Sequence, residues 1–149
     1  MLFLEHQILD MQNVVAVRVD ISEDKINDEL KRAAKQMDDN KMSRNGRAII
    51  SMCGDESWLL FPLIDVPAMI PDDWKFKDRF HLESAVRTRH EGEYSRLSKS
   101  IDELYGYVIK RGLNAITGHY CVMVRDWSHG VDLKNLIIDI YIGVSNNVL

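Results

Sequence analysis

The chain has 149 residues, 46% of them hydrophobic, enough for one domain that buries roughly two thirds of the surface of its unfolded chain. Its net charge of -4 and isoelectric point near 5.7 argue against a nucleic-acid surface, which needs a clustered excess of Lys and Arg. No apolar run approaches the roughly 20 residues of a membrane span, and Glu5 and His6 interrupt the apolar start before a signal-peptide core forms. We expect a single cytoplasmic domain, 1–149, without nucleic acid or membrane as direct partner.

The first half predicts a strand, a helix and two strands. Residues 1–13 alternate too weakly to assign, and an edge strand or an arm fits them equally well. A clear strand follows at 14–19, and Ser22 with the acids after it begins a helix that ends near Asn40. The inward apolar stripe of this helix is predicted to be Ile26, Leu30, Ala33, Ala34 and Met37. The β runs 47–53 and 58–64 flank a polar turn and therefore predict a hairpin.

The second half repeats that order after a connector with two prolines. Residues 85–89 have the pattern of a half-buried strand, and Gly92 gives the freedom that a strand-to-helix corner needs. Leu97, Ile101, Leu104, Tyr105 and Val108 then form the apolar stripe of a helix that ends before Gly112. Two further strands are predicted at 119–125 and 136–144, joined by a loop at 126–133.

The two halves also match in sequence. Ala16-Val17-Arg18 recurs as Ala85-Val86-Arg87, and the stripes of both helices align at nearly the same offset. We therefore predict a tandem duplication with one repeat at about 14–66, a connector at about 67–82 and a second repeat at about 83–144. The competing explanation is that any α+β protein can be aligned partly with itself.

Two segments carry a resemblance to a known family. Arg89-His90-Glu91-Gly92-Glu93-Tyr94 and the terminal Ile138-Asp139-Ile140-Tyr141-Ile142-Gly143-Val144 resemble two signatures of the GyrI-like effector-binding domain. That family typically shows Arg-His-x-Gly-Pro-Tyr before its second helix and a last strand of the type Thr-Glu-Ile-x-Ile-Pro-Val. Glu93, Asp139 and Gly143 depart from the pattern, which affects the expected shape of the pocket more than the fold.

The resemblance implies an α+β fold in which two strand-helix-strand-strand modules form one antiparallel sheet, with both helices on one face and a ligand groove on the other. Family members sense drugs in bacterial transcription activators or occur as free-standing proteins, and the absence of a helix-turn-helix here favours the free-standing form. The resemblance further implies an amphipathic, often cationic, aromatic ligand, so that the protein senses or sequesters drugs or toxins.

The last strand supplies the first candidate site residues. Ile138, Ile140, Ile142 and Val144 share one face and should meet the helices, so Ile137, Asp139 and Tyr141 should face the groove. There the carboxylate of Asp139 would attract a lipophilic cation. The alternative is an acid exposed to water on an open sheet face.

Aromatic residues complete the candidate set. Tyr94, Tyr105, Trp58 and Trp127 could present flat apolar surface to an aromatic ligand, although most aromatic residues of a small domain belong to its core. The five histidines show no metal-ligand spacing, and no phosphate loop, nucleophile elbow or dinucleotide fingerprint is present, so no metal or cofactor is expected.

Two other functions stay open at this point. A hydrolase could use Asp139 as a general base on a water that attacks a reactive natural product, which would require a raised pKa in an apolar pocket. A module that inhibits a protein partner such as a topoisomerase is the third reading. The ligand's identity and the oligomeric state stay open.

Overall fold

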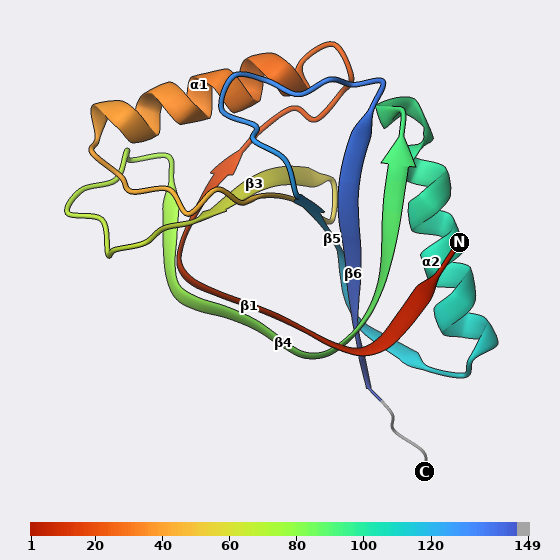
Figure 1. Ribbon diagram of the computed structural model, residues 1–149. Coiled ribbons are helices and arrows are strands. Elements are labelled where there is room, and N and C mark those ends of the chain that lie inside the picture. Colours follow the sequence, from red (N-terminus) through yellow and green to blue (C-terminus); the bar gives the residue numbers. More distant parts are fainter. Residues whose placement is uncertain (146–149) are drawn as a thin grey trace.

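The order strand, helix, strand, strand occurs twice in the computed structural model, which describes residues 1–145 without the side chain of Cys53 (Figure 1). The elements are β1 (Phe3–Arg18), α1 (Ile26–Asp39), β2 (Ala48–Cys53), β3 (Glu56–Pro62), β4 (Lys75–Gly92), a 3-10 turn (Tyr94–Arg96), α2 (Leu97–Lys110), β5 (Asn114–Met123) and β6 (Leu136–Ser145). The α+β class is thus confirmed. That the repeated order reflects a sequence duplication stays a prediction.

The six strands form one antiparallel sheet that closes on itself. Their order is β1-β3-β2-β5-β6-β4, and β4 pairs back with β1. Figure 1 shows β1 and β4 running side by side as a long curved ribbon away from α2 and then toward the region below α1. This ribbon closes the sheet into a barrel, which the sequence did not predict.

The ribbon also corrects two expected boundaries. β1 begins at Phe3, so most of the unassigned opening segment is strand, and β4 begins at Lys75, inside the expected connector 67–82. Charged, exposed residues such as Lys77 and Arg79 occupy this part of β4, and their polarity obscured the alternation. β1 has positive φ angles at His6 and Asn13 and two shifts of register before Leu9, the kind of irregularity that bends a strand.

Both helices pack against one hydrophobic core on the outer face of the sheet. On α1 the buried apolar positions are those of the predicted stripe: Ile26, Leu30, Ala33, Ala34 and Met37. On α2, Leu97, Leu104 and Val108 are buried as expected, whereas Ile101 is only partly buried. Neither helix of the described residues has the length and apolarity that crossing a membrane requires.

The opposite face of the sheet carries a second, smaller core. It consists of seven buried side chains, with four partly buried ones packed against them: Leu9, Met11, Val14, Ile49, Leu82, Ala85 and Val122, then Leu60, Phe80, Tyr120 and Tyr141. The β1/β4 ribbon contributes six of the eleven. The face expected to hold an open groove is therefore largely filled by side chains.

Candidate functional site

Asp139 lies on the face of β6 that points away from the helices, as the alternation predicts. Its neighbours Ile138 and Ile140 are fully buried in the helix-side core. In the sheet register Asp139 stands opposite Arg89 of β4 on one side and Val122 of β5 on the other. The Asp139 side chain is only 8% exposed, so its carboxylate is nearly withdrawn from water.

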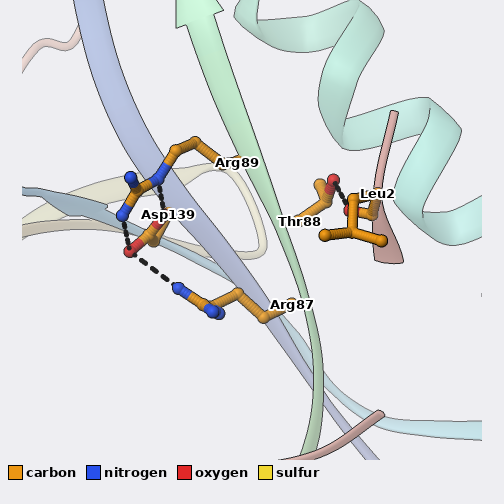
Figure 2. A network of polar contacts seen from close by, with 5 residues as sticks. All are labelled: Leu2, Arg87, Thr88, Arg89 and Asp139. Atoms are coloured by element: carbon orange, nitrogen blue, oxygen red, sulfur yellow. Dashed lines mark hydrogen bonds and ion pairs between the residues drawn. The ribbon is translucent and has the colours of Figure 1, made fainter. Parts of the chain in front are cut away.

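Two arginines occupy both oxygens of that carboxylate (Figure 2). Arg89 donates from Nε to Oδ1 at 2.8 Å and from Nη2 to Oδ2 at 3.1 Å, and Arg87 donates from Nη1 to Oδ2 at 3.2 Å. A forked guanidinium pair of this kind is the strongest geometry that Arg and a carboxylate form. The two motifs of the sequence therefore meet here, Arg89 of the first holding Asp139 of the second.

Arg87, Arg89 and Asp139 together carry a net positive charge, whereas the sequence predicted an unpaired, negatively charged acid at this place. Two guanidiniums surround one carboxylate, and Asp139 in turn raises the pKa of Arg89 through hydrogen bonding and charge attraction. The Nε of Arg87 is buried and has no hydrogen-bond partner among the described residues. The expectation that Asp139 attracts a cation, or removes a proton from water, gains no support from this geometry because its oxygens already accept three hydrogen bonds.

Two rows of side chains cross the sheet on this same face. The first row is Trp58, Ser51, Tyr120, Tyr141 and Arg87. The second row is Leu60, Ile49, Val122, Asp139 and Arg89, and beyond Leu60 it continues through Ala16 of β1 to Lys75 at the start of β4. The first row, which is largely aromatic, thus lies beside the second row, which is largely aliphatic. The second row has a cationic side chain at each end, Lys75 and Arg89.

An apolar hollow of about 320 Å³ lies where β1 passes between β3 and β4. We name it the ribbon hollow, and its lining residues are Val14, Ala16, Leu60, Lys75, Phe76, Lys77 and Phe80. Phe80 also packs edge-on against Tyr120 with ring centroids 4.8 Å apart. The ribbon hollow therefore shares the sheet face of Asp139 and Tyr141, while Phe80 reaches from its wall to the aromatic row.

The candidate residues separate into two groups. Asp139, Tyr141 and Trp58 lie on the barrel-facing side, and half-burial raises the pKa of Tyr141. Trp58 lies under Lys75, whose Nζ is 5.3 Å from the ring centroid. Ile137 lines a separate hollow of about 110 Å³ beside the loop that precedes β6.

The other three aromatic candidates lie on the helix side. Trp127 is 1% exposed and packs against Phe61 with ring centroids 4.6 Å apart. Tyr94 donates its hydroxyl hydrogen bond to the carbonyl of Ile21, and burial raises its pKa to about 12. Tyr105 reaches from α2 to His119 at 3.2 Å. The structure therefore does not bring these three together with the ribbon hollow.

His90 is a residue of the first motif whose role the sequence did not indicate. It is buried, and its Nε2 donates to the carbonyl of Glu93 at 2.9 Å while its Nδ1 lies 2.7 Å from the hydroxyl of Ser100. These contacts tie the end of β4 to the first turns of α2. In this motif Arg89 therefore binds Asp139 of β6, and His90 contacts Ser100 of α2.

The lining of the ribbon hollow was also missed. Phe76, Phe80 and Leu82 follow an even spacing that could have indicated a strand, but charged residues and the nearby prolines favoured a connector. Val14 and Ala16 were assigned to a strand, yet their position opposite Lys77 and Lys75 depends on a pairing between distant segments. Local pattern alone does not contain that pairing.

No protein-family model matches the sequence, and no curated protein matches it. Solved structures do match over nearly the whole chain. A hydrolase from Listeria innocua has a TM-score of 0.53 at 13% identity, with 93% of this chain and 91% of the other covered. An uncharacterised conserved protein from the same organism has a TM-score of 0.52 at 11% identity, with 95% and 93% covered.

A further match is the protein SAV2435 in its complex with tetraphenylphosphonium. Its TM-score is 0.56 at 15% identity, with 98% of this chain and 95% of that chain covered. At such low identities these likenesses concern the fold. The GyrI-like resemblance stays a prediction, and the chain shares its fold with proteins of which one holds an aromatic cation and another is called a hydrolase.

Proposed function

We propose that this protein binds a small amphipathic molecule, with the apolar part of the ligand in the ribbon hollow. The observation that carries the proposal is a hollow of about 320 Å³ whose lining is five apolar side chains and the stems of two lysines. Binding sites for small molecules are typically concave and mostly apolar, with few polar groups to orient the ligand. The ribbon hollow has this composition.

Two further observations support the proposal. Trp58, Phe76 and Phe80 place aromatic rings at or beside the hollow, which suits a ligand with an aromatic body. The similar protein SAV2435 holds tetraphenylphosphonium, itself an aromatic compound, in the same fold. On this basis the protein senses or sequesters such compounds, in a role linked to transcription regulation or to resistance against drugs or toxins.

Hydrolysis is the second candidate function because one similar structure is called a hydrolase. It would require a base with a free lone pair facing the substrate. Asp139, the acid assigned to that role, shares both oxygens with Arg87 and Arg89. Release of product from an electrophilic ester or epoxide by the wild-type protein, lost in Asp139→Asn, would support hydrolysis over binding.

Filling the hollow should abolish binding. Ala16 lines the hollow and pairs with Leu60 and Lys75, so Ala16→Phe places a ring in the space that a ligand would occupy. A strand accepts an aromatic residue readily, and we expect affinity for an aromatic probe to fall by at least about tenfold, which corresponds to about 1.4 kcal/mol.

The measurement is a thermal-shift titration with tetraphenylphosphonium and its anionic counterpart tetraphenylborate, since a bound ligand raises apparent stability by mass action. The matched control is Gln12→Phe, an exposed position on the same strand outside the lining. If neither probe stabilises the wild type, the proposed function is wrong. If Ala16→Phe binds as tightly as Gln12→Phe, the ligand lies elsewhere.

A further inference from the structure

The charge of the ribbon hollow determines which amphipathic molecules it can accept, and this inference rests on the proposed function. Lys75 and Lys77 both line the hollow. Among residues 1–145 neither lysine has a carboxylate within ion-pair distance, although the nearby Arg79 of the same strand is paired with Asp10. Within the described part of the chain, the two ammonium groups of the hollow therefore have no carboxylate in ion-pair contact.

The positions of the two ammonium groups bear on the ligand directly. The Nζ of Lys75 is 5.3 Å from the ring centroid of Trp58, and the Nζ of Lys77 is 5.9 Å from that of Phe80. A cationic ligand would be repelled by both groups and would compete with them for the same ring faces. An anion would instead meet two donors beside an apolar surface.

The acid expected to favour a cation is not available to offset these charges. Asp139 is held by Arg87 and Arg89, and these three side chains together carry one net positive charge. Lys75 and Arg89 stand at the two ends of one cross-strand row that runs through Ala16, Leu60 and Asp139. The barrel-facing surface thus has cationic side chains at both ends of that row.

We propose that the ribbon hollow selects organic anions, meaning compounds with an aromatic or aliphatic body and a carboxylate, sulfonate or similar acid group. The body lies against Val14, Leu60 and Phe80, and the acid group is held by Lys75 and Lys77. The side-chain stems of both lysines add apolar contact while their charged ends stay in water. Because the charges are partly solvated, the preference weakens as salt increases.

The test uses two probes of the same shape and opposite charge, tetraphenylborate and tetraphenylphosphonium. Their affinities are measured by calorimetric titration for the wild type, Lys75→Gln, Lys77→Gln and the double variant. We expect the double variant to lower the ratio of borate to phosphonium affinity by about tenfold, which is about 1.4 kcal/mol. Using the change in the ratio removes any intrinsic difference in hydrophobicity between the probes.

Lys99→Gln is the matched control because Lys99 is an exposed lysine on α2, outside the lining of the hollow. It should leave the ratio unchanged. A ratio that does not change in the double variant, or that changes equally in Lys99→Gln, overturns the inference while leaving the proposed binding function intact. Absence of binding of both probes to the wild type overturns the binding function and the inference together.

Discussion

Asp139→Asn is expected to lower the free energy of unfolding by about 3 kcal/mol. The substitution removes the negative charge that compensates the guanidiniums of Arg87 and Arg89. The amide that replaces the carboxylate has only one oxygen that can accept their hydrogen bonds. We take the lower end of the range for breaking a buried ion pair because Arg89 is 48% exposed and remains partly hydrated. Urea denaturation at neutral pH, with the slope compared between variants, measures the change.

The chain offers a matched control for this prediction. Arg79 also forms a bidentate pair with a carboxylate, donating from Nε to Oδ1 of Asp10 at 2.9 Å and from Nη2 to Oδ2 at 3.3 Å. That pair joins the same two kinds of side chain but lies on the surface, where solvent screens the charges. Asp10→Asn should therefore shift the unfolding midpoint far less than Asp139→Asn, and equal shifts would contradict the structural role of Asp139.

A double-mutant cycle separates the pair from its surroundings. If Asp139 acts chiefly through Arg89, then Arg89→Gln should lower the free energy of unfolding much less in the Asp139→Asn background than in the wild type.

The same Asp139→Asn protein tests the cation role predicted from the sequence. A selective loss of tetraphenylphosphonium affinity, with tetraphenylborate affinity kept, would show that Asp139 serves a cationic ligand after all.

The helices and the orientation of β6 were predictable because each depends on local periodicity. The stripe from Ile26 to Met37 defines α1, and the alternation of isoleucines around Asp139 places that acid on the far side of the last strand. Both features arise within one element, where spacing along the chain and position in space are directly related.

The partners of Asp139 and the ribbon hollow were not predictable in the same way. Arg89 precedes Asp139 by 50 residues, and only the register between β4 and β6 brings them together. The sequence motifs marked both residues but suggested a ligand acid, not a pair. Likewise, Trp127 was a candidate ligand residue in the predicted loop 126–133, whereas the structure buries its ring in the core against Phe61.

Leu104→Asp should abolish stable folding, with a loss of more than about 4 kcal/mol in the free energy of unfolding. Leu104 is fully buried between α2 and the sheet, where an unpaired carboxylate is left without water or a partner. Ile109→Asp is the matched control, since Ile109 is an aliphatic residue of the same helix that is 76% exposed. Thermal and urea unfolding should place Ile109→Asp near the wild type.

Ile101→Asp provides an intermediate case between Leu104→Asp and Ile109→Asp. The stripe predicted from the sequence treats Ile101 and Leu104 alike, but in the structure Ile101 is only partly buried while Leu104 is inaccessible. Ile101→Asp should consequently fall between the other two variants, because its carboxylate can still reach water along the helix surface. If Ile101→Asp unfolds as completely as Leu104→Asp, α2 is rotated so that Ile101 is buried as deeply as Leu104, as the sequence predicted. If Ile109→Asp is the most damaging of the three, the buried face of α2 is not the one described.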